Sequence, residues 1–173
     1  MAAAEAANHL LTTALFTTSQ HIACYFAQGK EFDCSHIIKA IWYAQKNCYL
    51  PVLSSDENKT LEFVRYQESD PLRFNRYNIL EPQNTIALAP QQLDLVLMPL
   101  VGFDFHGNRL GMGGGYYDRT FHFMMGKPQK KPYLLGLAYE IQQMTPLPSE
   151  PWDVPLDGVL TEKALYSFFK NLM

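Results

Sequence analysis

The sequence predicts a three-layer α/β fold with a mostly parallel central sheet. Apolar, strand-like segments alternate with helical patterns along the chain, which is typical of such layered domains. Residues 93–100 (LDLVLMPL) are almost wholly apolar, the pattern of a strand buried on both faces. A strand, a helix and a second strand follow one another within about 35 residues, the size of a right-handed parallel crossover unit. The length of 173 residues fits one domain, residues 1–173.

The first third of the chain predicts helix, strand, helix and strand. Residues 2–14 are rich in alanine and leucine, which favour a helix. The short apolar runs 21–26 (HIACYF) and 48–53 (CYLPVL) predict strands. Between them, residues 36–47 place apolar side chains on one helical face and follow Asp33, which is suited to capping.

The later elements follow from shorter patterns. In chain order we predict a strand at 61–66, an irregular proline-rich connection at 71–90, the buried strand at 93–100, a helix at 118–125, strands at 133–139 and 158–160, and a closing helix at 163–172.

Charge and cysteine content narrow the function classes. The formal net charge is -3, so the chain lacks the basic excess that nonspecific nucleic-acid binding needs, and we expect a small-molecule ligand. The basic cluster at 127–131 is interpreted as a solvated loop. No apolar run approaches the roughly 20 residues that span a membrane.

Three cysteines without a CxxC pair predict reduced thiols and a cytoplasmic protein. The five histidines show no metal-ligand spacing, so we assign none of them to a metal.

A glycine-rich segment follows the buried strand. Asp104, Gly107 and Asn108 predict a turn, and glycines follow at 111, 113, 114 and 115. Glycine lets the backbone approach an anion and adopt positive φ, so successive amides can converge on phosphate oxygens. GMGGG matches neither the P-loop nor the dinucleotide pattern, and glycine clusters also build tight turns. On the glycines alone, both interpretations stay open.

The flanks of the glycines favour a ligand site. Arg109 precedes them with a fork of donors, and Tyr116, Tyr117 and Asp118 follow them. A carboxylate beside a phosphate cradle suits Mg²⁺, which takes one or two carboxylates together with phosphate oxygens. The alternative for Asp118 is a first-turn acid favoured by the helix dipole.

The whole segment 103–118 fits the pattern FDxxGxRLGxGxGYYD, by which the chain resembles the 5-formyltetrahydrofolate cyclo-ligase family. The resemblance extends over nearly the whole chain, through HIACYF, KEFD, NILEP and WDVPLDGVLTE. It implies a Rossmann-like fold and the conversion of 5-formyltetrahydrofolate and ATP into 5,10-methenyltetrahydrofolate, ADP and phosphate, with Mg²⁺ required. It also implies a folate substrate as the small-molecule partner, and we expect a monomer or weak oligomer.

The resemblance also implies roles for individual residues. Arg109 and Tyr116 would be catalytic. The ATP site would comprise Arg109, Leu110, Gly111, Met112, Gly113, Gly114, Gly115, Tyr116 and Tyr117. The folate site would comprise Phe26, Glu31, Tyr77, Met112, Gly113, Gly114, Gly115 and Tyr116. For Tyr77, a plain surface or core tyrosine is the alternative. Asp118 and Asp157 would bind Mg²⁺.

The chain departs from the family in one respect. Members usually open with a basic helix, some of whose residues reach ATP, whereas no Lys or Arg precedes Lys30 here. Two interpretations are open. Either Met1 is an internal or misassigned start, which we prefer, or the chain is a shortened, noncatalytic folate- or nucleotide-binding module. A different ATP-dependent ligase on the same scaffold is a further alternative.

Overall fold

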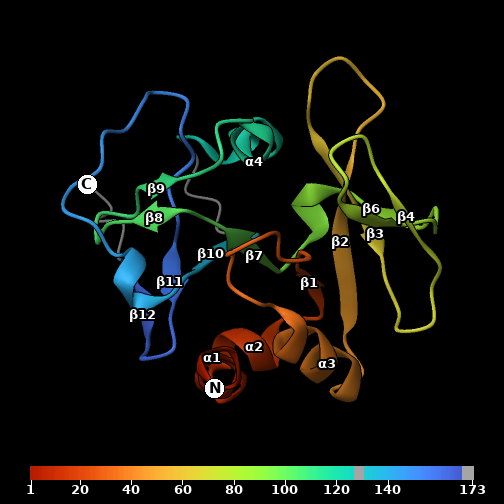
Figure 1. Ribbon diagram of the computed structural model, residues 1–173, viewed down its shortest axis with the longest axis horizontal. Helices are drawn as coiled ribbons and strands as arrows, with labels where there is room; N and C mark the ends of the chain where they lie inside the picture. Colours follow the sequence, from red (N-terminus) through yellow and green to blue (C-terminus); the bar gives the residue numbers. More distant parts are fainter. Residues whose placement is uncertain (127–130, 169–173) are drawn as a thin grey trace.

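A single eight-stranded sheet forms the centre of the computed structural model, which describes residues 1–126 and 131–168 (Figure 1). The strand order is β12-β11-β10-β7-β1-β2-β3-β6. These strands are β1 (His21–Ala23), β2 (Asn47–Leu53), β3 (Leu61–Arg65), β6 (Ala87–Leu88), β7 (Leu95–Pro99), β10 (Tyr133–Leu137), β11 (Gly158–Leu160) and β12 (Leu165–Ser167). Neighbours from β11 to β2 pair in parallel, and β12, β3 and β6 add antiparallel edges. The predicted mostly parallel sheet is confirmed.

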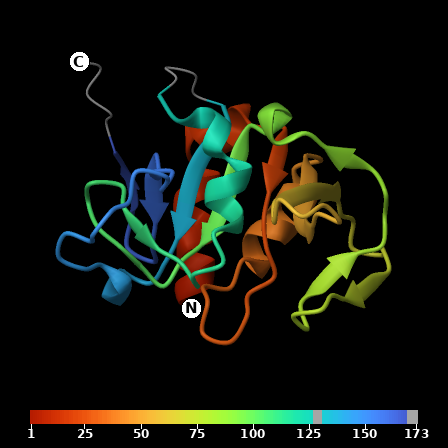
Figure 2. The same cartoon turned by 90° about the horizontal axis from the view of Figure 1, so that it is seen from above.

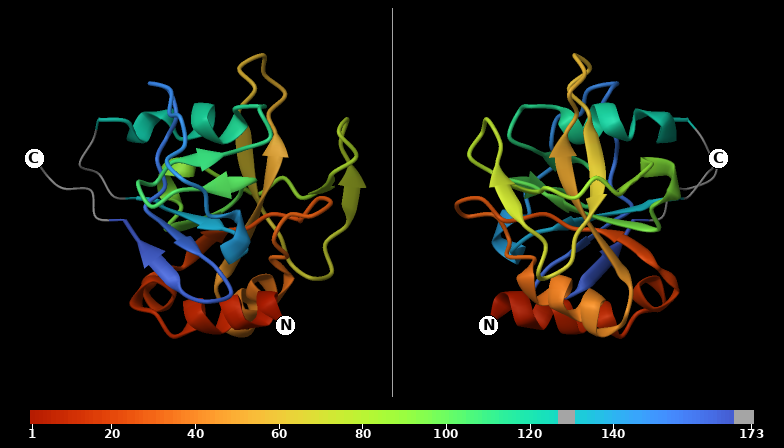
Figure 3. Two further views of the ribbon diagram at one scale, coloured as in Figure 1. Left: turned by 60° about the vertical axis from the view of Figure 1, so that its left-hand side comes forward. Right: turned by 90° about the vertical axis from the view of Figure 1, so that its right-hand side faces the viewer.

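Helices cover both faces of this sheet. The helices α1 (Ala2–Leu11), α2 (Ala14–Thr18) and α3 (Ser35–Tyr43) lie on one face, and α4 (Tyr116–Thr120) with the 3-10 turn η2 (His122–Met124) lies on the other (Figures 1 and 3). Alternate side chains of β7 pack into the two helical layers. Leu95 and Leu97 belong to the apolar cluster with α1 and α3, whereas Val96 and Met98 belong to the cluster with Phe121.

The alternation explains the fully apolar run in the sequence. All four of these β7 side chains are completely buried, and burial of each stabilises the fold by roughly 1.5–3 kcal/mol. A strand with helices on both sides must be apolar at every position. The three-layer prediction is therefore confirmed.

The remaining elements are short. β4 (Leu72–Phe74) and β5 (Leu80–Pro82) form a separate antiparallel hairpin beside the central sheet (Figure 2). β8 (Gly102–Phe103) and β9 (Arg109–Leu110) form a second one. The 3-10 turns η1 (Pro90–Gln92) and η3 (Glu140–Gln142) complete the list.

The connection at 71–90 is more regular than predicted. It contains β4, β5 and β6, of three, three and two residues. Strands this short show too few alternations to be recognised in a sequence.

The predicted helix at 2–14 is divided into α1 and α2. The Thr13 hydroxyl donates to the Leu10 carbonyl at 2.6 Å and accepts from the Phe16 amide at 3.2 Å. Threonine at this place therefore ends one helix and caps the next. The predicted helix at 118–125 is similarly divided between α4, which begins two residues earlier, and η2.

The closing helix predicted at 163–172 is wrong over the residues of it that the structure describes, 163–168. Residues 165–167 form β12, which pairs antiparallel with β11. The Thr161 hydroxyl accepts hydrogen bonds from the amides of Lys163 and Ala164, and the Thr161 amide donates to the Ala164 carbonyl at 2.9 Å. These bonds make a turn that returns the chain along the open edge of β11. Residues 169–172, and 127–130 of the basic cluster, lie outside the described residues.

Candidate active site

A cavity of about 1180 Å³ opens where the parallel strands end. The cavity wall includes Tyr25 and Phe26, which follow β1. It also includes Leu50, Pro51 and Leu53 of β2, and Pro99 and Leu100 at the end of β7. Ligands of open parallel sheets bind at this carboxyl edge because the loops after the strands diverge there. The position of the cavity therefore matches a ligand site of this fold class.

The cavity brings together the predicted ATP and folate residues. All of them line it, and so does Asp118; the set is Phe26, Glu31, Tyr77, Arg109, Leu110, Gly111, Met112, Gly113, Gly114, Gly115, Tyr116, Tyr117 and Asp118. Residues separated by up to 92 positions in the chain thus face one space. Their functional roles remain predictions.

The turn before the glycines is built around a buried carboxylate. Asp104, which is 1% exposed, accepts from the amides of His106, Asn108 and Leu147 and from the Asn108 side chain, at 2.8–3.0 Å. Burial acts to raise the pKa of Asp104, but these hydrogen bonds outweigh it and leave the pKa below its ordinary value. Asp104 is therefore a structural acid that shapes the β8–β9 turn and carries Arg109 to the cavity.

Two of the glycines have backbone conformations that other residues resist. Gly113 has a φ of +89° and Gly115 a φ of +68°, both in the left-handed region. Gly115 directly precedes α4. The loop therefore depends on glycine, as the phosphate-cradle and tight-turn interpretations both require.

Arg109 and Asp118 join the two ends of the glycine segment. Nη2 of Arg109 lies 3.0 Å from Oδ1 of Asp118, and the arginine side chain is only 9% exposed. The guanidinium lies over the ring of Tyr117 at 5.8 Å, and burial raises the pKa of this tyrosine. Nε of Arg109 is buried and has no hydrogen-bond partner in the described residues. A buried donor without a partner is costly, and an anionic ligand in the cavity would relieve that cost.

Tyr116 is held by residues that the motif does not contain. Its hydroxyl lies 3.1 Å from the Tyr77 hydroxyl and accepts from Nη2 of Arg76 at 3.1 Å. The hydrogen bonds from Tyr77 and Arg76 lower the pKa of Tyr116 below its ordinary value. Sequence analysis missed Arg76 because it is 40 positions away from Tyr116 and matches no motif.

Arg119 ties the glycine loop to the loop between β2 and β3. It donates to the carbonyls of Gly114 and Lys59, the latter at 3.0 Å, and its guanidinium lies 5.3 Å from the Tyr116 ring. Arg119 directly follows the motif at 103–118, and no role was predicted for it.

Glu31 lines the cavity from the connection between β1 and α3. Its Oε2 accepts from the Gln28 amide at 2.8 Å. Burial raises the pKa of Glu31 above its ordinary value, and the hydrogen bond from Gln28 offsets this only in part. Phe26 beside it packs edge-on against Tyr66, with ring centroids 5.5 Å apart. A carboxylate next to an apolar wall suits a flat heterocycle that donates hydrogen bonds.

The two predicted metal ligands are placed differently. Asp118 lines the cavity, whereas Asp157 is not among the described lining residues, and its Oδ2 accepts from the Leu134 amide at 2.8 Å. Asp153, four residues earlier in the same segment, does line the cavity, next to the 61% exposed Trp152. In residues 1–126 and 131–168, no three His, Cys, Asp or Glu side chains are grouped to hold a metal.

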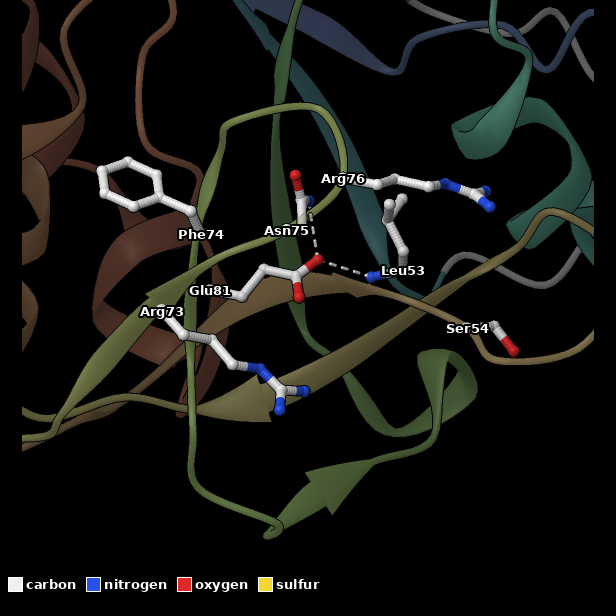
Figure 4. Close-up of a pocket in the computed structure, with 7 residues that line it drawn as sticks. All are labelled: Leu53, Ser54, Arg73, Phe74, Asn75, Arg76 and Glu81. Carbon is white, nitrogen blue, oxygen red and sulfur yellow. Dashed lines mark hydrogen bonds between the residues drawn. The ribbon is translucent and has the colours of Figure 1, made fainter.

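A smaller cavity of about 360 Å³ adjoins the first and shows how the β4–β5 hairpin is anchored (Figure 4). The buried Glu81 accepts from the Leu53 amide at 3.0 Å and from Nδ2 of Asn75 at 2.8 Å. Oδ1 of Asn75 accepts from the amides of Tyr77 and Ile79 at 2.9 and 3.1 Å. Glu81, from the segment NILEP, therefore fixes the hairpin that carries Arg76 and Tyr77.

Comparison with known proteins gives one consistent answer. A model of the 5-formyltetrahydrofolate cyclo-ligase family matches residues 1–162. The 5-formyltetrahydrofolate cyclo-ligase of Haemophilus influenzae is 43% identical over 147 residues, covering 82% of this chain and 75% of the relative. The Escherichia coli K12 enzyme of the same name is 34% identical over 166 residues, covering 95% of this chain and 90% of the relative. The NMR structure of Aquifex aeolicus 5,10-methenyltetrahydrofolate synthetase superposes with a TM-score of 0.80 at 27% identity, covering 99% of this chain and 83% of that one.

Proposed function

Because the chain belongs to the 5-formyltetrahydrofolate cyclo-ligase family, we propose that it cyclises 5-formyltetrahydrofolate to 5,10-methenyltetrahydrofolate at the expense of ATP, releasing ADP and phosphate. The chain is an enzyme, a ligase that forms a carbon–nitrogen bond. The observation that carries the proposal is one cavity lined both by the whole segment from Arg109 to Asp118 and by Glu31 and Phe26.

The chemistry needs positioning more than a nucleophile from the protein. In the proposed reaction the formyl oxygen forms a bond to the γ-phosphorus of ATP and ADP leaves. The second folate nitrogen then attacks the formyl carbon, and the carbon–oxygen bond breaks to release phosphate. Such transfer is accelerated by alignment and by donors directed at the phosphoryl oxygens. Arg109, with its unpartnered buried Nε, and the backbone of Gly113 to Gly115 are suited to that task.

The carboxylates at the cavity fit a magnesium ion. Mg²⁺ prefers oxygen ligands and shares them between one or two carboxylates and phosphate oxygens. Asp118 is the predicted ligand that lines the cavity, and Asp153 is a second lining carboxylate. Asp157 stays a predicted ligand, with its carboxylate bonded to the Leu134 amide. When bound, the ion would neutralise charge on the phosphate oxygens.

We propose that the reaction takes place in the cytoplasm. We also propose that the chain is a monomer or weak oligomer. The cysteines Cys24, Cys34 and Cys48 are all free and buried, which agrees with a reducing compartment. Among the described helices, none has the length and apolar character needed to cross a bilayer.

The direct test mixes the protein with Mg-ATP and 5-formyltetrahydrofolate and follows the absorbance of the methenyl product. We expect product and ADP in equal amounts, and none when ATP or Mg²⁺ is left out. Calorimetric titration with each ligand distinguishes an enzyme from a protein that only binds these ligands. Binding of folate or nucleotide without turnover would identify a noncatalytic binding module, and turnover of another acid substrate would identify a different ligase.

A further inference from the structure

The β4–β5 hairpin reaches across the cavity to Tyr116 through Arg76. Nη2 of Arg76 donates to the Tyr116 hydroxyl at 3.1 Å, and the guanidinium lies 5.1 Å from the centre of the Tyr77 ring. Tyr77 packs edge-on against Tyr116, with ring centroids 6.4 Å apart and hydroxyls 3.1 Å apart. Arg76 therefore contacts both aromatic residues of this cluster.

The hairpin can hold Arg76 in place because Glu81 anchors it to strand β2 of the central sheet. Glu81 is 4% exposed and accepts from the Leu53 amide of the central sheet. Asn75 bonds to Glu81 and to the amides of Tyr77 and Ile79 (Figure 4). The residue just before Arg76 and the one just after it are thus both fixed, which limits the positions of the arginine itself.

The hydrogen bond from Arg76 limits where the Tyr116 proton can point, and either hydroxyl of the Tyr77–Tyr116 pair can be the donor. A phenol oxygen accepts from donors and carries a single O–H. When Arg76 and Tyr77 both donate to this oxygen, the Tyr116 proton is left for an acceptor in the cavity, which Tyr116 and Gly113 to Gly115 line. A phosphoryl oxygen is an acceptor of the right kind.

We propose that Arg76 is a positioning residue of this site, which holds the Tyr116 hydroxyl so that its O–H is presented to a phosphoryl oxygen of the bound nucleotide. The proposal rests on the proposed cyclo-ligase function and adds a residue outside the glycine motif. It assigns the β4–β5 hairpin a part in the reaction, with Arg76 acting through Tyr116 and not on the substrate directly.

The first test measures the position of Tyr116 without any turnover. The protein is labelled with tyrosine carrying ¹³C at the hydroxyl-bearing carbon, and Y116F assigns the Tyr116 signal. In R76Q the chemical shift of this carbon at pH 7 should move, because the hydrogen bond from Nη2 of Arg76 to the Tyr116 oxygen is lost. R73Q is the matched control, because exposed Arg73 lies on the same hairpin (Figure 4) and the described contacts of Tyr116 do not include it. An unmoved Tyr116 signal in R76Q, or an equal shift in R73Q, would overturn the proposal.

The second test is a kinetic cycle. R76Q should lower kcat by about tenfold, less than the roughly 10²–10⁴-fold that a positioned general acid contributes, because Tyr116 itself remains, and R73Q should not lower kcat. R76K should recover part of the loss, because lysine also donates. R76Q should cost nothing further in a Y116F background, so additive losses would overturn the proposal. If the wild-type protein forms no methenyl product, the proposed function fails, while the Tyr116 chemical shift still decides whether Arg76 holds the hydroxyl.

Discussion

Nη2 of Arg109 lies 3.0 Å from Oδ1 of Asp118, so that an ion pair closes the glycine segment into a loop against the cavity. The same carboxylate oxygen accepts from the Val154 amide at 3.0 Å. Asp118 therefore connects three parts of the site: the arginine before the glycines, the helix after them, and the segment that carries Trp152 and Asp153.

Asp118→Asn tests the metal role of this carboxylate. The amide oxygen can still accept from Val154, but the 9% exposed Arg109 loses its charged partner, so stability should fall by roughly 1–3 kcal/mol. Loss of the negative charge should raise the Mg²⁺ concentration needed for half-maximal turnover by about tenfold or more. An unchanged Mg²⁺ titration would reject the role.

Asp153→Asn and Asp157→Asn decide which acid is the second ligand. Asp153 lines the cavity, whereas the Asp157 carboxylate bonds to the Leu134 amide. We expect Asp153→Asn to weaken the Mg²⁺ dependence and Asp157→Asn to act mainly on thermal stability. The opposite result would support the prediction made from the sequence. Chemical unfolding of both variants, beside the Mg²⁺ titrations, separates the two outcomes.

Gly113→Ala tests whether the loop conformation matters for nucleotide binding. An added Cβ at Gly113 meets no atom within 4 Å, so the cost comes from its φ of +89° and should be roughly 1–2 kcal/mol. Gly126→Ala is the matched control, because Gly126 also has positive φ (+67°) and an open Cβ position. Both variants should lose similar stability, and only Gly113→Ala should weaken ATP binding measured by calorimetry. Equal ATP affinities would remove the loop from the nucleotide site.

Glu31→Gln is expected to separate stability from activity. Because the folded pKa of Glu31 is raised by burial, the folded state binds its proton more tightly than the unfolded state does. The wild-type protein therefore loses stability as pH rises from the unfolded value of about 4.3 through the raised folded pKa. Glu31→Gln should remove that loss and be at least as stable as wild type at pH 7, while its KM for the folate rises. Urea unfolding between pH 4 and 7 measures the first effect. A less stable variant at pH 7 would contradict the assignment.

Asp104→Asn should show the opposite pH dependence. The folded pKa of Asp104 lies below its ordinary value, so its contribution is present above the unfolded value of about 3.9 and is lost as pH falls through the folded pKa. At pH 7 the variant should lose roughly 2 kcal/mol, because one amide oxygen must serve donors that two charged oxygens served. The difference from wild type, measured by urea unfolding, should shrink below pH 4. A constant difference at all pH values would show that the charge is not involved.

Local patterns determined much of the fold and of the loop. The apolar run at 93–100 predicted a central strand correctly because helices on both faces require every β7 side chain to be apolar. The pattern from Phe103 to Asp118 is contiguous, so the sequence of one segment predicted both the turn and the glycine loop. It was sufficient to indicate the family, which the comparisons confirm.

Contacts between distant exposed residues could not be found in this way. Over the described residues 163–168, the predicted closing helix was wrong because residues 165–167 pair with the free edge of β11. A neighbouring strand is not visible in a local pattern. The resemblance implied Asp157 as a metal ligand from the segment WDVPLDGVLTE, and this role stays a prediction; Asp153 of the same segment lines the cavity.

The sequence by itself therefore determined the family, the parallel sheet and the glycine loop from Arg109 to Asp118. Only the tertiary structure brought Arg76 to Tyr116 and Glu31 to the same cavity as the glycine loop. The physical reason is that apolar periodicity and glycine spacing record burial and backbone conformation, which are local requirements. A hydrogen bond between two side chains 40 positions apart depends on how separate loops meet at one edge of the sheet.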